Sequence, residues 1–490
     1  MPSRHTLLPR SAPSAAGVPA RAVAALLDRI EELSLECHSL MVVRRGRVVA
    51  EGWWAPYSAG RPHLLYSLTK SFTSIATGIA IGDGLLSLED RVVDVLPGHV
   101  PADVSAQGRR ITVHHLLSMT SGHREDSLTE AWRREPGDLT RGFLRVPFAY
   151  PEGTRHTYDN ATTYLLARMV ERVTGRGLPE FLDERLFRPM GVEHAEWDRL
   201  ASGAVFGFHG LHLTTEAVAA FGELLLREGR WGDRQLVPRD YVRLATRRHI
   251  ETLPAEVGGG GADWLCGYGY QFWMSRHGYF GNGAYGQDCL VVPDHDLVIA
   301  MTCAVLDEQP LLDAIGECLL PALDGEPSAR DDEILAARMR RLSLAPVPGA
   351  AAPGRRAEAT IEPAEPAEPA EPAEPAGAAG AAPLPSGTKV VVEPVEGGWR
   401  LRLGSSLIVD AGHGEWRESS PLGRPVVAAG AWQGDTFVAD LYVITTPHRL
   451  RLTVDAVEGT AAAAWNVEPL TKPDLALHLR SPLMTRPDVA

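Results

Sequence analysis

The chain has 490 residues, 44% of them hydrophobic and 22% charged, a composition and length typical of more than one globular domain. The formal net charge is −14 and no extended basic run occurs, so nucleic acid is not an expected partner. No stretch reaches the roughly 20 apolar residues that are needed to span a membrane, so no membrane partner is expected either.

The first 15 residues are interrupted by prolines and lack the apolar run of about 7–15 residues that forms the core of a secretory signal. We expect residues 1–15 to be disordered. The five cysteines are odd in number and widely spaced, with no Cys-x-x-Cys pair that would indicate zinc or a redox couple. These features favour a reducing compartment, so we expect a cytoplasmic protein that has no metal and no cofactor.

Residues 16–345 have the pattern of an α+β domain. Helical periodicity over 20–35 leads into a β-hairpin at 39–54, and three further short strands lie within 267–303 before a closing helix at 311–323. Strands at both ends with helix-rich sequence between them predict one antiparallel sheet, flanked by the terminal helices, with a helical lobe inserted in the middle.

Low-complexity sequence separates this domain from the C-terminal part of the chain. The triplet Glu-Pro-Ala is repeated five times over residues 362–376, and repeated proline with like charges favours an extended spacer. We therefore predict a linker over 346–387, a small all-β module over 388–482 because its segments alternate between apolar and polar residues, and a tail over 483–490. We interpret the tryptophans of the β module as core residues rather than as a sugar-binding platform. They are Trp399, Trp416, Trp432 and Trp465.

The basic residues are strongly biased towards arginine. Of 48 lysines and arginines only three are lysines, and Lys70 is the only lysine in the first 388 residues. Lysine can lose its proton when it is desolvated, whereas arginine cannot. A lysine retained at position 70 therefore indicates a chemical use.

Lys70 follows Ser67 by three residues and opens an apolar stretch that predicts a buried helix ending near Gly82. Positions i and i+3 share a helix face, so Lys70 can take the proton of the Ser67 hydroxyl while N–H groups of the first turn stabilise an oxyanion. The alternative is a helix N-cap serine beside a surface charge. A second Ser-x-x-Lys, Ser386 to Lys389, leads into a strand and has no helix to align the pair.

A second motif, Tyr158-Asp159-Asn160, precedes an amphipathic helix. Of 11 tyrosines only Tyr158 stands in a Tyr-x-Asn pattern. A phenol near an ammonium can share the proton transfer, first as base and then as acid to the leaving group. The Asn160 amide is expected to hold Lys70 and a substrate carbonyl, unless Asp159 or Asn160 only caps the helix.

A third motif is the glycine-rich segment 280–287, which leads into a strand. Glycine within a strand commonly marks a bulge or a close backbone approach. An edge strand here would let the Ala284 N–H join the Ser67 N–H in an oxyanion hole, with the substrate lying along the strand. We therefore expect Asn282, Gly283 and Ala284 to line the substrate.

The order Ser67-x-x-Lys70, Tyr158-x-Asn160, then a glycine-rich strand resembles the serine β-lactamase and penicillin-binding-protein superfamily, most of all its class C branch, which includes esterases and D-aminopeptidases. The resemblance covers roughly residues 15–325. It implies a β-lactamase/transpeptidase-like fold, acylation of Ser67, proton transfer by Lys70 and Tyr158, substrate and lysine contact by Asn160, and hydrolysis of the acyl-enzyme by water.

The chain departs from this family at the start of the third motif. Members that act on penicillins or peptides usually have Lys or His there, which helps to receive a substrate carboxylate, whereas this chain has Gly281, with Arg276 or His277 as possible substitutes. We therefore expect a serine hydrolase of small-molecule esters or amides. The alternatives are a β-lactamase or D-aminopeptidase/carboxypeptidase, and a catalytically silent ligand-binding or scaffold protein. The oligomeric state does not follow from the sequence.

Overall fold

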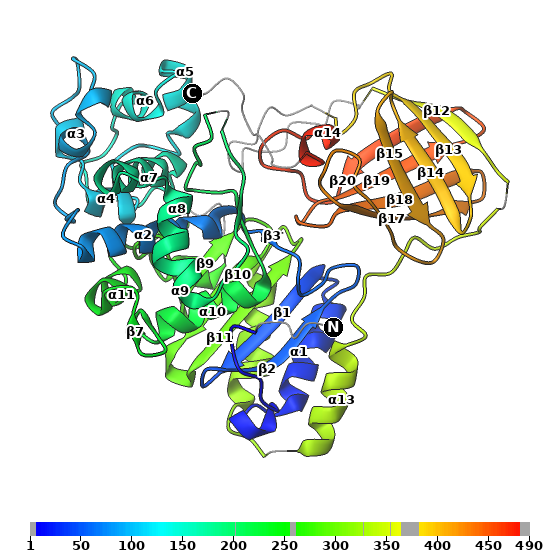
Figure 1. Cartoon of the computed structure of the whole chain (residues 1–490), viewed down its shortest axis with the longest axis horizontal. Coiled ribbons are helices and arrows are strands. Elements are labelled where there is room, and N and C mark those ends of the chain that lie inside the picture. The colour runs from blue at the N-terminus through cyan, green and yellow to red at the C-terminus, as the bar shows by residue number, and fades with distance from the viewer. Residues whose placement is uncertain are drawn as a thin grey trace. The chain divides into compact units, whose positions relative to one another are not determined.

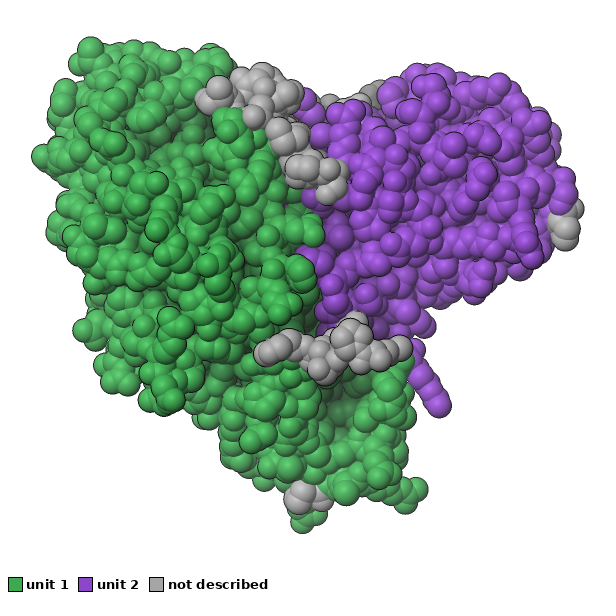
Figure 2. Space-filling view, viewed as in Figure 1, with its two compact units in different colours: residues 1–52, 65–340, 486–490 green, residues 53–64, 341–485 purple. Residues whose placement is uncertain are grey.

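The computed structural model describes residues 6–200, 202–254, 261–326, 328–352, 354–363 and 382–480. The described chain divides into two compact units (Figure 2). Of the described residues, the first unit contains those up to Gly52 and Leu65–Arg340, and the second contains Trp53–Leu64 and those from Arg341 onward. Each unit is described by itself.

The first unit is built on a six-stranded antiparallel sheet with the strand order β2-β1-β11-β10-β9-β8 (Figure 1). Strands from both ends of the unit meet at its centre, because β1 pairs with β11 from Cys37↔Cys303 to Arg44↔Leu297. This arrangement confirms the predicted antiparallel sheet. Its strands are β1 (Cys37–Arg44), β2 (Arg47–Trp53), β8 (Trp273–Ser275), β9 (Gly278–Gly283), β10 (Gln287–Val292) and β11 (Leu297–Cys303).

Helices from the two ends of the unit pack together, as expected. Helix α1 (Ala20–Glu32) buries Val23, Leu26 and Ile30 along one face and contacts α12 (Gln309–Ala314) and α13 (Ala329–Met339). Helix α10 (Thr215–Leu226) packs against β1, β10 and β11. The sheet is thereby covered by helices that burial of apolar side chains holds in place.

The helical lobe lies between β2 and β8 in the chain, and its central element is α2 (Thr69–Gly82). Every residue of α2 from Thr69 to Ala80 is buried, which confirms the predicted buried helix. Helix α2 packs against α7, α8 and α11. The other elements are α3 (Val92–Val95), α4 (Val113–Leu117), α5 (Leu128–Arg134), α6 (Leu139–Arg145), α7 (Asn160–Thr174), α8 (Leu178–Leu182), α9 (Arg188–Met190), β4 (Glu196–Trp197), β5 (Leu211–Leu213), β6 (Arg230–Trp231), β7 (Arg234–Gln235) and α11 (Arg239–Ala245).

The second unit is a closed β-barrel in which most neighbouring strands are antiparallel, while the pairs β12–β20 and β15–β17 are parallel. Its nine strands have the order β15-β14-β13-β12-β20-β19-β18-β17-β16, and β15 also pairs with β17, which joins the two ends of the sheet. They are β12 (Ala357–Ile361), β13 (Lys389–Val395), β14 (Gly398–Leu403), β15 (Leu407–Gly412), β16 (Arg417–Ser419), β17 (Val426–Gln433), β18 (Thr436–Val443), β19 (Arg449–Asp455) and β20 (Thr460–Trp465), and β3 (His63–Leu64) and α14 (Leu475–His478) also belong to this unit.

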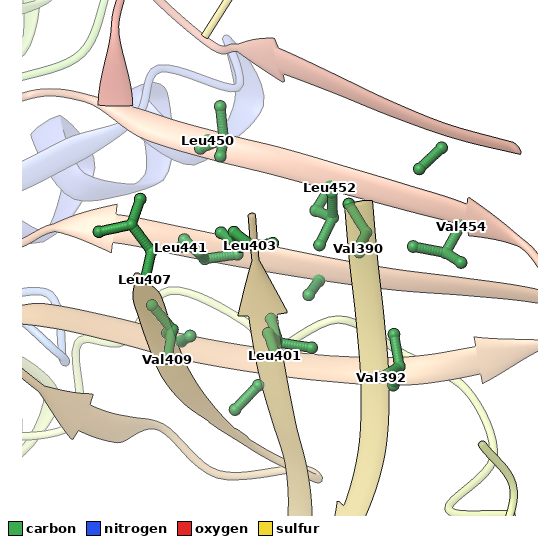
Figure 3. Packing of buried hydrophobic residues seen from close by; sticks show 14 of the residues in the cluster. Val390, Val392, Leu401, Leu403, Leu407, Val409, Leu441, Leu450, Leu452 and Val454 are labelled. Atoms are coloured by element: carbon green, nitrogen blue, oxygen red, sulfur yellow. The ribbon is translucent and has the colours of Figure 1, made fainter. Parts of the chain in front are cut away.

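Alternate residues of the barrel strands point inward and pack into one apolar core (Figure 3). Trp399 and Trp432 are 1% and 2% exposed and belong to this core, and Trp416 and Trp465 pack partly buried against apolar clusters. The interpretation of the tryptophans as core residues is therefore confirmed for Trp399 and Trp432.

Three segments differ from the boundaries expected from sequence. Strand β12 lies within the expected linker and pairs with β13, because Ala357, Ala359 and Ile361 alternate inward; residues 364–381 lie outside the described residues. Residues 6–15, expected to be disordered, pack against the first unit through buried Leu8 and through Arg10, whose guanidinium binds Glu51 at 2.7 Å.

The third segment is Trp53–Leu64, which leaves the first unit after β2 and returns two residues before Ser67. Its Tyr57 is 6% exposed, donates a hydrogen bond to the Thr446 carbonyl at 3.0 Å and packs edge-on against Tyr442. Arg61 pairs with Glu418 at 2.8 Å. Nothing in the linear pattern indicates that this segment belongs to the C-terminal module.

Among the described residues, the helices are all too short or too polar to traverse a bilayer.

Candidate active site

Ser67 lies in a 3-10 turn, Tyr66–Leu68, that leads directly into α2. Its side chain is half-buried, whereas both neighbours in the turn are buried. Tyr66 has φ 46°, a left-handed conformation that is uncommon for a residue with a side chain and that costs free energy unless the surroundings hold it. The turn is therefore a strained segment that presents one hydroxyl.

Lys70 lies one turn further along and reaches back to that hydroxyl. Its side chain is 1% exposed, and Nζ donates hydrogen bonds to Ser67 Oγ at 2.8 Å and to the Phe208 carbonyl at 3.3 Å. The i, i+3 spacing thus brings the two side chains into direct contact. The buried Lys70 Nζ is held between the serine and a backbone carbonyl.

Tyr158 faces the same lysine from the segment that precedes α7. Lys70 Nζ lies 4.8 Å from the centroid of its ring. The ring stacks on Trp273 with 5.7 Å between centroids and 14° between planes, and meets Tyr268 edge-on at 6.4 Å. Ser67, Lys70 and Tyr158 therefore come together, although 88 residues separate Lys70 from Tyr158 in the chain.

Asn160 is the first residue of α7, and its observed partner is Asp126. Its side-chain Nδ2 donates to Asp126 Oδ2 at 2.6 Å and its backbone N–H donates to Asp126 Oδ1 at 3.1 Å. Asp159 caps the same helix by accepting from the Ala161 N–H at 2.9 Å. Asp126 is a residue of this site that the sequence reasoning missed, because no spacing links it to Tyr158-x-Asn160.

Asp126 and Asp159 form a pair of neighbouring carboxyl groups with opposite pKa shifts. Burial, together with the charge of Asp159, raises the pKa of Asp126 to about 8. Burial by itself would raise the pKa of Asp159, but contacts with His123, Asp126 and Ser127 lower that pKa below its usual value. The pair therefore holds one proton at neutral pH, on Asp126.

The glycine-rich motif forms the end of β9, whose backbone lies against the turn that carries Ser67. A Cβ atom at Gly283 would be 2.0 Å from the Leu65 carbonyl oxygen, and one at Gly281 would be 2.5 Å from Leu68 Cδ1 and 2.7 Å from Ser71 Oγ. Only glycine permits this approach. Strand β9 is not the outermost strand, but β8 pairs only with residues 278–280, so within the described sheet 281–283 has β10 alone beside it.

Residues of the third motif are held by hydrogen bonds to neighbouring polar side chains. Asn282 Nδ2 donates to Asp288 Oδ1 at 2.8 Å and also to Glu308 Oε2. Ala284 begins the turn 284–286 that joins β9 to β10, and its carbonyl accepts from Gln287 Nε2 at 3.1 Å. Asp288, Gln287 and Glu308 are further residues that sequence reasoning missed.

The possible substitutes for the missing cation at Gly281 have other contacts. The Arg276 guanidinium pairs with Asp263 and Asp313, each at 2.6 Å, and these contacts raise its pKa still further. His277 lies against Gly316. Arg276 is therefore committed to a structural ion pair.

His209 is a further group beside the lysine that the sequence did not single out. It is 9% exposed and follows Phe208, the residue whose carbonyl binds Lys70. Burial, together with the charge of Lys70, lowers the pKa of His209 to about 4, although Asp198 opposes the shift. The imidazole next to Lys70 is therefore neutral at physiological pH.

Replacing Gly283 by alanine should separate β9 from the Ser67 turn, because the added Cβ would meet a backbone oxygen that cannot move alone. We expect the rate of p-nitrophenyl acetate hydrolysis to fall by about 10²-fold, the scale of a misplaced reacting geometry. Gly137→Ala is the matched control, since nothing lies within 4 Å of a Cβ there. An unchanged rate in Gly283→Ala would contradict the close approach.

The raised pKa of Asp126 makes stability depend on pH. The folded chain keeps a proton up to about pH 8 that the unfolded chain loses near its ordinary pKa of 3.8, so the free energy of unfolding falls as pH rises through this window. Asp126→Asn removes that dependence. The free energy of unfolding of the variant, relative to that of the parent, should therefore be higher at pH 8 than at pH 5 by at least about 1.4 kcal/mol, the equivalent of one pKa unit.

Urea unfolding of both proteins at pH 5 and pH 8 measures this difference. Asp103→Asn serves as the control, because that side chain is 71% exposed. The pKa of Asp159 is lowered below 3.8, so it contributes no change between these two pH values. Equal differences at both pH values would show that Asp126 is not protonated in the folded protein.

Comparisons with known proteins agree with this arrangement. A family model described as Beta-lactamase matches residues 21–314. The "Putative D-alanyl-D-alanine carboxypeptidase" of Escherichia coli (strain K12) is 26% identical over 251 residues, which cover 40% of this chain and 58% of that protein. Penicillin-binding protein 4 of Amycolatopsis lactamdurans is 29% identical over 245 residues, covering 48% and 60%.

A third relative is the lovastatin esterase of Penicillium rubens, which is 30% identical over 156 residues, or 27% of this chain and 39% of the esterase. The chain spans about three-fifths of the length of the first two relatives. The family model covers more than half of the chain, including all three motifs. On this evidence the chain belongs to the β-lactamase family.

Proposed function

We propose that the protein is a serine hydrolase, of the class C type, that acts on small-molecule esters or amides through an acyl-enzyme on Ser67. The observation that carries the proposal is the 2.8 Å hydrogen bond between the buried Lys70 Nζ and Ser67 Oγ. A lysine in this position can accept the hydroxyl proton as the oxygen attacks a carbonyl carbon.

The proposed cycle has two halves. Ser67 Oγ forms a bond to the carbonyl carbon while its proton passes to Lys70, and Tyr158 beside the lysine returns a proton to the leaving alcohol or amine. The Ser67 and Ala284 N–H groups stabilise the oxyanion. Water then attacks the acyl-enzyme, its proton is taken up by the same pair, and the acid is released with Ser67 restored.

The preference for esters and amides that lack a carboxylate rests on charge. Gly281 stands where relatives active on penicillins or peptides have a cation, and Arg276 is paired with two aspartates. The nearby carboxyl groups, Asp126 and Asp288, add acceptors and no cation to this region. The lovastatin esterase among the relatives is consistent with an ester substrate, while the carboxypeptidase relative keeps peptides as the alternative.

We also propose a cytoplasmic location. All five thiols are free within the described residues, including buried Cys37 and Cys303, whose Sγ atoms are 3.4 Å apart. Unlinked thiols at this distance are consistent with a reducing compartment.

Variants of the Ser67–Lys70 pair test the mechanism. We expect Ser67→Ala to abolish p-nitrophenyl ester turnover, and Lys70→Arg, which keeps the charge but cannot act as a base, to lower kcat by at least about 10²-fold. The chain offers a matched control in its second Ser-x-x-Lys. Ser386→Ala and Lys389→Arg, where Lys389 is 62% exposed, should retain full turnover.

A substrate panel tests the proposed preference. We expect kcat/KM for neutral p-nitrophenyl esters to exceed that for benzylpenicillin by at least about 10-fold, since an unpaired substrate carboxylate loses a charged hydrogen bond worth about 1.5–3 kcal/mol. Arg276→Ala should leave the ratio unchanged because its guanidinium is already paired. Efficient penicillin turnover without esterase activity would make the alternative function the correct one.

A further inference from the structure

The turn between β9 and β10 carries the proposed oxyanion donor Ala284, and its backbone conformation is intrinsically unfavourable. Tyr285 and Gly286 have φ values of 71° and 82°, both in the left-handed region, which is unfavourable for the tyrosine. The Tyr285 ring meets the ring of Tyr66 edge-on, with 5.6 Å between centroids. The turn therefore lies beside Ser67, and its geometry depends on groups that hold it.

Glu308, which precedes α12, holds both ends of this turn. Its Oε1 accepts a hydrogen bond from the Gly286 N–H at 2.8 Å, and its Oε2 accepts from Asn282 Nδ2. Asn282 comes before Ala284 and Gly286 comes after it. One carboxyl group thus binds residues on both sides of Ala284, whose N–H would donate to the oxyanion.

Gln287 fixes the same residue from its carbonyl side. It is fully buried, and its Nε2 donates to the Ala284 carbonyl at 3.1 Å and to the Cys303 carbonyl at 2.8 Å. The Ala284 carbonyl shares its peptide group with the Tyr285 N–H, so this anchor limits rotation about the backbone bonds of Ala284. Glu308 and Gln287 together restrain both ends and the centre of the turn.

The burial of Glu308 has an electrostatic cost. Its side chain is 8% exposed, and burial and the charge of Asp288 raise its pKa well above the usual value. The titratable groups that face it are Asp288 on β10, Asp307 before it and Cys303 on β11, so none of those described is a cation. A carboxyl kept in such a place without a cation indicates that its hydrogen bonds are needed.

We propose that Glu308 is a positioning residue of the oxyanion hole: by binding Asn282 and Gly286 it fixes the direction of the Ala284 N–H beside Ser67. The inference rests on the proposed function, since it requires that Ser67 is acylated. It assigns Glu308 no contact with the substrate. Its effect should therefore appear in kcat rather than in KM.

Glu308→Gln tests the proposal with little change in shape. Glutamine can still accept from Gly286, but its NH2 group would face the NH2 group of Asn282, so the clamp loses one hydrogen bond. For p-nitrophenyl acetate we expect kcat to fall by about 10–100-fold, below the full loss of an oxyanion donor, with KM within about twofold of the parent.

Glu223→Gln is the matched control. Glu223 is also a buried carboxyl of the first unit, 6% exposed, but it pairs with Arg227, the residue that follows α10. Its replacement should therefore leave kcat unchanged. Circular dichroism and the melting temperature verify folding. Should Glu308→Gln not fold, Glu308→Asp decides, because it keeps the carboxyl group and shortens its reach. A selective loss of kcat supports the proposal and parental kcat overturns it.

Two results would overturn the inference. They are parental kcat in folded Glu308→Gln and a rise in KM without a fall in kcat. The proposed function fails in a different way: the parent protein itself would then show neither turnover nor an initial burst of p-nitrophenol, and the inference would fall with it. A burst in the parent together with unchanged kcat in Glu308→Gln removes the positioning role alone.

Discussion

The contact between Lys70 Nζ and Ser67 Oγ is the interaction on which the rest of the site depends. It requires a lysine at 1% exposure, which a fold accepts only where Nζ finds hydrogen-bond partners. The Phe208 carbonyl supplies one and the serine another. The buried helix α2, the strained turn before it and the aromatic rings around Tyr158 fix the geometry of this contact.

Two pairs of carboxyl groups form hydrogen bonds that hold the second and third motifs in place. Asp126 with Asp159 holds the start of α7, and Asp288 with Glu308 holds the turn after β9. Each pair binds the asparagine of a motif, Asn160 in one case and Asn282 in the other. Burial raises the pKa of Asp126 in the first pair and of both Asp288 and Glu308 in the second, which favours the protonated form and lets two acids lie side by side.

Much of the fold and the central pair could be predicted from sequence, because both depend on local spacing. Lys70 and Ser67 share a helix face by their i, i+3 spacing, and the alternation and periodicity of the first domain were enough for the antiparallel sheet and the inserted lobe. Strand β12 and the segment Trp53–Leu64 were not predicted as parts of the barrel. Each is short, and its assignment depends on contacts with residues far away in the chain.

The partners of the asparagines could not be predicted for the same reason. Asp126 lies 34 residues before Asn160, and Glu308 lies 26 residues after Asn282. No periodicity connects such positions, and a single carboxylate in a loop has no distinguishing pattern. We expected Asn282 to contact a substrate. In the structure its side chain binds two acids, Asp288 and Glu308, and the sequence does not indicate this contact.

Peptide mapping by mass spectrometry after reaction with a fluorophosphonate tests the central claim most directly. The account predicts one adduct, on the peptide that contains Ser67, formed by the parent chain and greatly slowed when Lys70 is replaced by arginine. An adduct on another residue, or equally fast labelling of Ser67 without Lys70, would contradict it.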